Sequence, residues 1–160
     1  MANTGGRTER LNLILTLGQV YIPASLRRSQ LRKLFVCTAA AFQKPPPPLG
    51  SSSAGALRTY ALFTRDLAEE SFRQGADERE IRDRLYQNAY RLGCELRKTL
   101  RPATPDEVRA AMRLLYRAMG IKAKFDVEGN VTISACYFSS FYSGRICQLI
   151  SALDAGVAAA

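Results

Sequence analysis

The sequence contains no histidine. Histidine is the side chain that most often serves as a general base near neutral pH, and the chain has no complete catalytic or metal-binding motif built from other residues. Catalysis that depends on an imidazole is therefore excluded. The sequence also lacks any stretch of 18 or more apolar residues, so no segment is expected to span a bilayer as a helix.

Cysteine is sparse and widely spaced, at Cys37, Cys94, Cys136 and Cys147. There is no C-x-x-C pair and no dense cysteine framework, which argues against a zinc ribbon and against a disulfide-stapled secreted module. A reducing compartment follows, and we expect a cytoplasmic protein. The apolar run 11–20 is interrupted by polar residues and lacks a cleavage site, so it is a poor secretory signal.

Acidic residues are nearly missing from residues 1–44, which hold seven Arg or Lys against Glu9 alone, while residues 45–160 hold sixteen basic and thirteen acidic residues. This asymmetry favours an anionic partner for residues 1–44, either nucleic acid or an acidic membrane surface. A solvated basic helix face is the alternative interpretation. An Arg-rich, acid-poor amino terminus is also typical of organelle-targeting segments, which is the alternative to a cytoplasmic location.

Four consecutive prolines and a Gly/Ser run follow Lys44. Proline removes backbone donors and favours extended chain, and Gly/Ser segments are flexible, so residues 45–55 are predicted to be a linker. The sequence thus divides into a basic helical arm (1–44), the linker (45–55) and a body (56–160) long enough to bury a core.

Helical periodicity predicts most of the secondary structure. A short helix is expected over 11–20 and a second, capped by Ser25, up to about Phe42, with four basic residues in its first two turns that oppose the helix dipole. Further helices are expected over 56–74, from Asp77 to before Pro102, and from the Thr104-Pro105-Asp106-Glu107 capping box to Gly120. The last of these helices is expected to bury Val108, Ala111, Met112, Leu115 and Met119.

Strict alternation replaces the helical period between Ile121 and Cys136. Apolar and charged residues alternate over 121–128, Gly129-Asn130 makes a turn, and 131–136 alternate again, which predicts an antiparallel hairpin. By this alternation Cys136 lies on the face opposite the apolar residues. The predicted fold class is helix-dominated α+β, with helices packed on one face of this small sheet.

The stretch from Cys136 to Asp154 is the candidate site. Cys136 ends a strand, an aromatic loop follows, and Cys147 lies in the first turns of a final helix expected to bury Ile146, Ile150, Leu153 and Val157. The helix amino terminus and Arg145 are expected to lower the pKa of the Cys147 thiol, which favours a nucleophile or a metal ligand. A simple packing role for this cysteine is the alternative. The ligand-binding candidates are Tyr137, Phe138, Phe141, Tyr142 and Arg145.

The order of these features resembles a known group: a long helix containing R-L-G-C-E-L, a capped helix, Gly120, the hairpin, Cys136 with its aromatic loop, Cys147 and Asp154. Residues 56–160 resemble the L-2-amino-thiazoline-4-carboxylic acid hydrolase-like proteins and, more distantly, the 4-vinyl reductase small-molecule-binding domains. The pattern of those families continues into two further strands, which have no counterpart before Ala160. The resemblance implies catalytic roles for Cys136, Cys147 and Asp154 only.

Three functions compete. The first is a domain that binds a small molecule or a metal at the mouth lined by Cys136, Cys147 and the aromatic loop, with a thiolate-bound metal or an iron–sulfur cluster as the candidate cofactor. Because two thiolates do not complete a structural zinc site, Asp154, Cys94 or a second chain has to add ligands. The second is a thiol-dependent hydrolase, and the third is the anionic-partner role of residues 1–44. A homo-oligomer is expected, since a lone hairpin leaves an edge and apolar surface uncovered.

Overall fold

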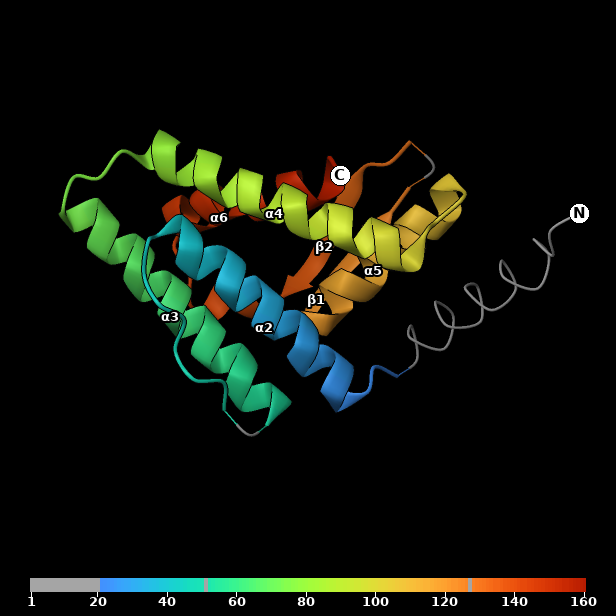
Figure 1. Cartoon of the computed structure of the whole chain (residues 1–160), viewed down its shortest axis with the longest axis horizontal. Helices are drawn as coiled ribbons and strands as arrows, with labels where there is room; N and C mark the ends of the chain where they lie inside the picture. The colour runs from blue at the N-terminus through green and yellow to red at the C-terminus, as the bar shows by residue number, and fades with distance from the viewer. Residues whose placement is uncertain (1–20, 51, 127) are drawn as a thin grey trace, which may run out of the picture.

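The computed structural model describes residues 21–50, 52–126 and 128–160, which form a helix-dominated α+β fold (Figure 1). Within these residues there are five helices, one short 3₁₀ turn and one two-stranded antiparallel sheet. The elements are α2 (Ala24–Ala41), α3 (Ser53–Arg73), α4 (Glu78–Leu100), α5 (Pro105–Ala118), β1 (Ile121–Phe125), β2 (Val131–Cys136), η1 (Tyr137–Ser140) and α6 (Gly144–Ala158). The predicted fold class is confirmed, while the helix expected over 11–20 lies outside the described residues.

Local side-chain chemistry starts four of the five described helices. Ser52, Asp77 and Ser143 each accept a hydrogen bond from a first-turn backbone N–H, and Thr104 forms the predicted reciprocal capping box with Glu107. The exception is α2, where the cap is Pro23 and no side chain caps the helix, so the expected Ser25 cap is wrong. Because α3 begins at Ser53, the last three residues of the expected linker are helical.

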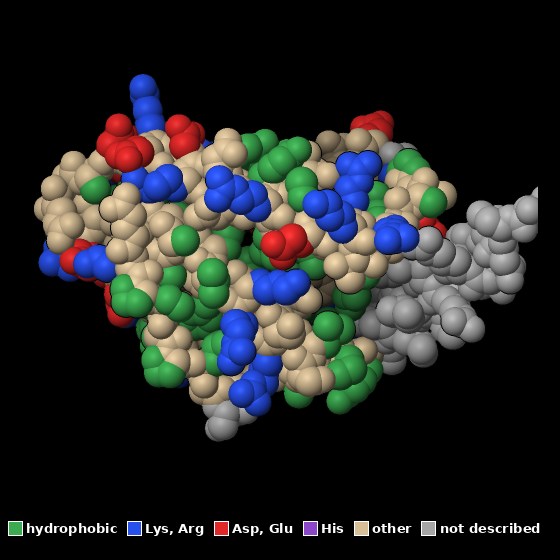
Figure 2. All heavy atoms as spheres, viewed as in Figure 1, with side chains coloured by type: hydrophobic (Ala, Val, Ile, Leu, Met, Phe, Trp, Pro, Cys, Tyr) green, Lys and Arg blue, Asp and Glu red, His purple; other side chains and the backbone are tan. Residues whose placement is uncertain are grey.

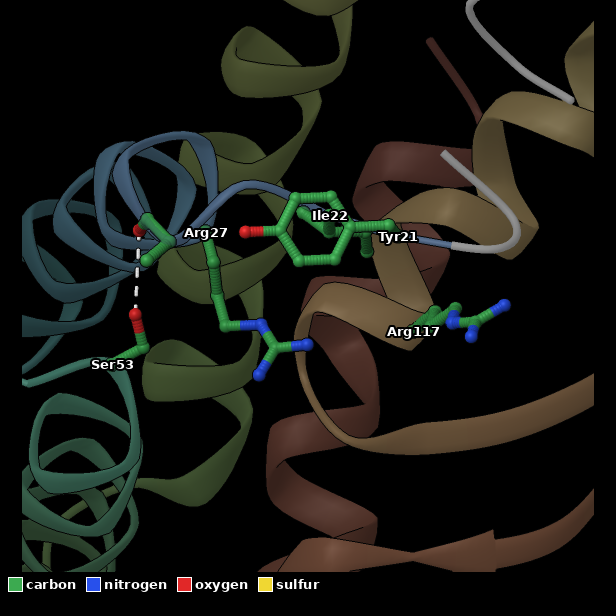
Figure 3. A pocket seen from close by; sticks show the side chains of 6 residues that line it. Tyr21, Ile22, Arg27, Ser53 and Arg117 are labelled. Atoms are coloured by element: carbon green, nitrogen blue, oxygen red, sulfur yellow. Dashed lines mark hydrogen bonds between the residues drawn. The ribbon is translucent and has the colours of Figure 1, made fainter. Parts of the chain in front are cut away.

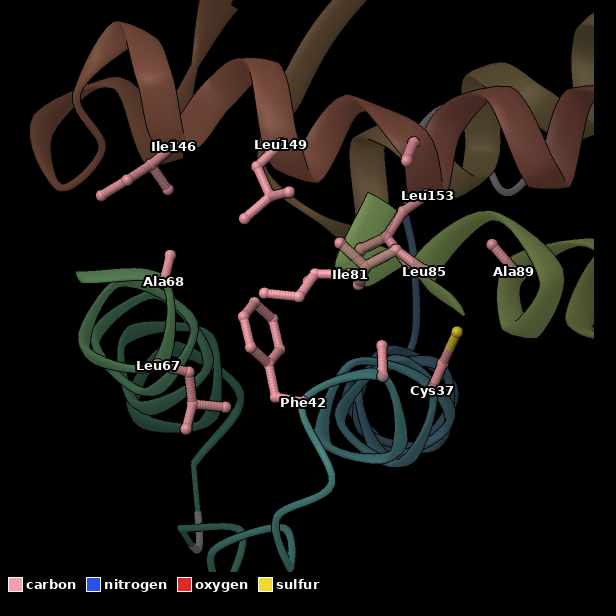
Figure 4. Packing of buried hydrophobic residues seen from close by; sticks show 12 residues of the cluster. Cys37, Phe42, Leu67, Ala68, Ile81, Leu85, Ala89, Ile146, Leu149 and Leu153 are labelled. Carbon is pink, nitrogen blue, oxygen red and sulfur yellow. The ribbon is translucent and has the colours of Figure 1, made fainter. Parts of the chain in front are cut away.

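The core consists of two clusters of buried side chains, and α2 contributes to both. Cys37, Ala41 and Phe42 pack with α3, α4 and α6 (Figure 4), and Leu31, Leu34 and Phe35 pack with α3 and the aromatic loop. Leu31 and Ala41 are fully buried. Residues 24–41 thus pack with the rest of the described fold, which speaks against a separable arm, while the division at residue 44 stays a prediction. Removing α2 would expose to water the apolar side chains that it covers.

The helices α4 and α6 pack closely because glycine lies at their contact. A Cβ atom at Gly156 would stand 2.8 Å from the Ala89 Cβ and against the Tyr86 carbonyl oxygen, and one at Gly93 would meet Val157. The close packing predicted at Gly93 is confirmed. The buried face of α6 carries Ile146, Leu149, Ala152, Leu153 and Gly156, so Ile150 and Val157 are only half-buried, contrary to expectation.

Helix α5 covers the β1 strand of the hairpin, while most of β2 is exposed. Helix α5 packs against β1, where the Tyr116 and Phe125 rings lie 5.9 Å apart, whereas Val131 and Ile133 of β2 are 43% and 49% exposed. The apolar face of α5 is also less buried than predicted: Met119 is buried, Ala111, Met112 and Leu115 are half-buried, and Val108 is exposed. In the described residues, no helix is both long and apolar enough to cross a membrane.

Candidate functional site

A β-bulge decides where Cys136 points. The pairing Lys122 with Ala135 is followed by Ala123 with Ile133, which leaves Ser134 as an extra residue in β2. A bulge of this kind reverses the facing of the residues beyond it. Cys136 pairs with Ile121 and packs beside it against the core, so the prediction that it lies opposite the apolar residues is wrong.

The aromatic loop is folded inward. Phe138 is buried and stacks on Tyr142 with ring centroids 5.3 Å apart, and Tyr137 lies 5.4 Å from Phe141. Phe138 also meets the Tyr60 ring edge-on at 5.9 Å. The four aromatic side chains predicted to line an open mouth thus largely pack on one another and on the core. Aromatic pairs of this geometry favour such a packed arrangement.

The Arg145 side chain contacts two neighbouring helices. Its guanidinium forms an ion pair with Glu78 of α4 and lies 4.0 Å above the Phe72 ring of α3. This cation–π contact and ion pair connect three helices. The side chain therefore acts as a structural clamp at the start of α6, and it is not among the groups that affect the Cys147 thiol.

Cys147 is exposed on α6, but it is not activated. Partial burial of the sulfur, and then the neighbouring Cys136, raise the pKa of the Cys147 thiol above its ordinary value. The expected lowering of this pKa is therefore wrong, because desolvation and a second thiol outweigh the helix amino terminus. The coupling also shows that Cys136 and Cys147 lie within electrostatic range of each other.

Asp154 lies two turns further along α6 than Cys147. The residue is exposed to water, yet protein surrounds its carboxyl closely enough for desolvation to raise its pKa, and the nearby Tyr116 hydroxyl of α5 partly offsets this. Burial, and after it the Asp154 carboxylate, raise the pKa of Tyr116. Burial first, and then Asp154 among smaller effects, raises the pKa of Tyr60, while burial and then Tyr60, Cys147 and Cys136 raise that of Tyr142.

A set of buried hydroxyls lies behind these residues and was missed by the sequence analysis. We call Thr38, Tyr60, Thr64 and Tyr142 the hydroxyl cluster. Thr38 Oγ1 and the Tyr60 hydroxyl are 2.9 Å apart. Burial raises the pKa of Tyr60 and Tyr142, and nearby Thr64 offsets a small part of this rise. The Thr64 Oγ1 atom and the Tyr142 hydroxyl nevertheless have no partner with hydrogen-bonding geometry among the described residues.

Unpaired buried hydroxyls are unusual, because leaving a buried polar group without a hydrogen bond costs about 1–3 kcal/mol. Thr64 has no exposed surface, so bulk water cannot reach it in this conformation. The sequence carried one signal for the cluster, since Thr38 and Thr64 both fall within otherwise apolar helix faces.

Metal chemistry finds limited support in this geometry. Among the described ranges, no group of three or more Cys, Asp or Glu side chains is arranged to hold a metal ion. Cys136 and Cys147 supply at most two ligands, whereas structural zinc takes four. Asp154 and Cys94 do not complete the set, so the metal and iron–sulfur predictions require ligands from elsewhere.

Positive charge is gathered on the face formed by α2 and α4, where Figure 2 shows many Lys and Arg side chains and few acids. Helix α2 contains Arg27, Arg28, Arg32 and Lys33 and no acidic residue. On α4, three arginines donate to backbone carbonyls of other elements: Arg82 to Gln148, Arg84 to Ala41 and Arg97 to Ala160. The basic surface is therefore partly structural and partly available to a partner.

No protein-family model, curated protein or solved structure matches this chain. The resemblance of residues 56–160 to the hydrolase-like proteins thus stays a prediction.

Proposed function

We propose that this protein is a small-molecule-binding domain whose ligand contacts the hydroxyl cluster and the face carrying Cys136, Cys147 and Asp154. The observation that carries this proposal is the pair of unpaired hydroxyls on Thr64 and Tyr142, beside aromatic rings that pack face to face and edge to face. Binding sites combine apolar and aromatic walls with a few convergent polar groups, and this region has both.

The chemistry of the hydroxyl cluster limits the class of ligand. Thr64 and Tyr142 offer neutral hydroxyls that donate to an acceptor, and burial raises the pKa of Tyr142 so that its hydroxyl keeps its proton. The cations of the chain are not part of the hydroxyl cluster. A neutral, partly aromatic molecule with a carbonyl or amide acceptor fits these groups better than a carboxylate or phosphate.

Binding is favoured over the alternative of a thiol-dependent hydrolase. A cysteine nucleophile reacts as the thiolate, and both burial and Cys136 disfavour the Cys147 thiolate. Asp154 has a raised pKa and lies two turns further along α6, where its role as a base is unsupported by any described contact with a thiol. The hydrolase function therefore rests on the family resemblance alone.

The test uses protein purified under reducing, anaerobic conditions. Native mass spectrometry measures any bound small molecule, and elemental analysis measures metal. We expect a bound organic species that is lost from Thr64→Val and from Tyr142→Phe. Thr59→Val is the matched control on α3, because Thr59 already donates to the Gly55 carbonyl of its own helix.

Cysteine variants test whether the two thiols contact the ligand or only pack in the fold. If they line the site, Cys136→Ser and Cys147→Ser should lower occupancy, whereas Cys94→Ser should not. Equal occupancy in all of these variants and in the hydroxyl variants would overturn the proposal. A metal retained at unit stoichiometry by wild type and lost from either cysteine variant would instead support the metal-binding alternative.

A second candidate function is the binding of a macromolecular anion by the α2–α4 face, favoured by its concentration of Lys and Arg side chains (Figure 2). Binding of this kind weakens steeply with salt, because each neutralised phosphate releases counterions. We expect Arg28→Gln with Arg32→Gln to reduce both the affinity for duplex RNA or DNA and its salt dependence. Salt-insensitive binding would contradict this electrostatic explanation.

A further inference from the structure

A separate cavity lies where the first turns of α2 and α3 come together near the end of α5 (Figure 3). Its volume is about 300 Å³, and it is lined by Tyr21, Ile22, Ala24, Arg27, Ser53 and Arg117. This volume is at the lower end of the range for small-molecule sites, about 300–1,000 Å³. None of these six residues is acidic, and Arg27 and Arg117 place two guanidinium groups along the wall.

Arg27 supplies a buried donor without an acceptor. Its Nε atom is shielded from water and has no hydrogen-bonding partner, and in the described ranges its guanidinium forms no ion pair. In Figure 3 this side chain extends from α2 into the space below the Tyr21 ring. A guanidinium stays protonated at all physiological pH values and cannot relieve the burial by losing its proton. An anionic oxygen from a ligand would satisfy it.

Two helix amino termini add to this charge. Ala24 and Ser53 are the first residues of α2 and α3, and the Ser53 hydroxyl donates to the Ala24 carbonyl at 3.3 Å, which connects the two helix starts. Neither helix has an acidic residue in its first turn, and α2 has no side-chain cap. Among the described residues, no side chain caps the first N–H groups of α2, and the positive ends of both helix dipoles lie at the cavity wall.

A bound anion would also explain a feature of the sequence that helix stability leaves unexplained. Cationic side chains near the start of a helix oppose its dipole, yet α2 carries Arg27 and Arg28 in its first two turns and contains no acid at all. Phosphate is the anion most often held by a helix amino terminus together with a basic side chain, because its several oxygens accept from N–H groups and guanidinium at once.

We propose that this cavity binds the phosphate group of a small phosphorylated molecule, with Arg27 Nε and the α2 amino terminus as donors and Tyr21 at the rim. The site is distinct from the hydroxyl cluster, whose groups are neutral, and the proposal does not depend on the function proposed above. The elements that form it are long helices packed into the core, so the donors are held in position without ligand.

The test is a thermal-shift and calorimetric titration of the full chain with inorganic phosphate and with glycerol 3-phosphate. A ligand that binds only the folded state raises its stability in proportion to ligand concentration over Kd. We expect Arg27→Gln to weaken binding about 10- to 100-fold, the loss of one charge-assisted hydrogen bond. Arg28→Gln is the matched control, since it removes the same charge from the neighbouring exposed position, and it should change affinity less than about twofold in 150 mM salt.

Arg27→Lys keeps the experiment decisive if the glutamine variant folds poorly. This variant retains the charge but loses the planar guanidinium, so it should bind with intermediate affinity. Equal weakening by Arg27→Gln and Arg28→Gln would show diffuse attraction to a basic surface and overturn the proposal. Absence of any stabilisation by either phosphate at millimolar concentration would also overturn it, as would binding to phosphatidic acid vesicles without binding to the soluble phosphates.

Discussion

At the scale of single residues, the buried hydroxyls divide into one satisfied pair and two unpaired groups. Thr38 and Tyr60 share a hydrogen bond of 2.9 Å, while Thr64 and Tyr142 have none of acceptable geometry. The two cases differ in their effect on stability. Removing one partner of a hydrogen bond leaves the other buried group unpaired and destabilises the fold, whereas removing an unpaired buried hydroxyl removes its desolvation penalty.

Two threonine-to-valine variants therefore have opposite expected effects. Thr38→Val leaves the Tyr60 hydroxyl unpaired in the core and should lower the free energy of unfolding by about 1–3 kcal/mol. Thr64→Val should leave it unchanged or raise it by up to about 1 kcal/mol in protein freed of small molecules. Urea denaturation followed by circular dichroism measures both. A loss for Thr64→Val as large as for Thr38→Val would show that Thr64 has a partner.

Asp154 gives a pH dependence of known sign. Its pKa is raised in the folded protein above the ordinary value of 3.8, so the folded state binds the proton more tightly and stability falls as pH rises through that raised pKa. Asp154→Asn should consequently be more stable than wild type at neutral pH, and this advantage should shrink as pH falls from the raised folded pKa toward 3.8 and be lost below it. Thermal denaturation between pH 3 and 8 checks it. An advantage that grows on acidification would contradict desolvation as the cause.

At the scale of elements, the contact between α4 and α6 depends on glycine. Gly156 faces the Tyr86 carbonyl and Ala89 so closely that no Cβ fits. Because the nearest atoms include backbone, neither helix can adjust by rotating a side chain. The packing of the final helix, which carries Cys147 and Asp154, is set by this contact.

Gly156→Ala should destabilise the fold by about 3 kcal/mol, at the upper end of the range for overpacking. The control is Gly144→Ala at the start of the same helix, where a Cβ would meet nothing within 4 Å. That change should be neutral or stabilise by up to about 1 kcal/mol, since alanine loses less backbone entropy than glycine. Chemical denaturation of both variants tests the pair, and equal stabilities would refute the close contact.

At the scale of the whole molecule, α2 joins both core clusters and the β2 strand is left partly uncovered. Removing residues 1–44 takes away the buried side chains of Leu31, Phe35 and Phe42. We expect the remaining chain to lose cooperative unfolding, as judged by thermal denaturation followed by circular dichroism. A sharp, wild-type-like transition in this truncation would restore the separable-arm interpretation.

The homo-oligomer expected from the sequence stays a prediction, and the exposed β2 residues give it a test. Val131 and Ile133 are apolar and about half exposed. If a second copy covers them, Ile133→Lys should convert an oligomer into a monomer in light scattering while leaving the circular-dichroism spectrum unchanged. Lys124→Ala on the other face of the hairpin serves as the control. A wild-type protein that is monomeric at high concentration would exclude this oligomer.

The sequence alone determined the features that arise from neighbouring residues. The Thr104 capping box, the ends of α4 and α5, the turn at Gly129 and the alternation of the hairpin all depend on contacts within a few positions. The helix-dominated α+β class follows from the same periodicities. These features can be predicted from the sequence because the groups that interact lie only a few residues apart along the chain.

Only the tertiary structure decided the contents of the candidate site. The bulge at Ser134 reversed the facing of Cys136, and the aromatic loop packed inward on Tyr60, which lies far away in the sequence. Thr38 and Tyr60 meet across 22 residues, and the Arg27 cavity requires three helices. Desolvation depends on everything that surrounds a group, so the raised pKa of Cys147 could not be predicted from the residues beside it along the chain.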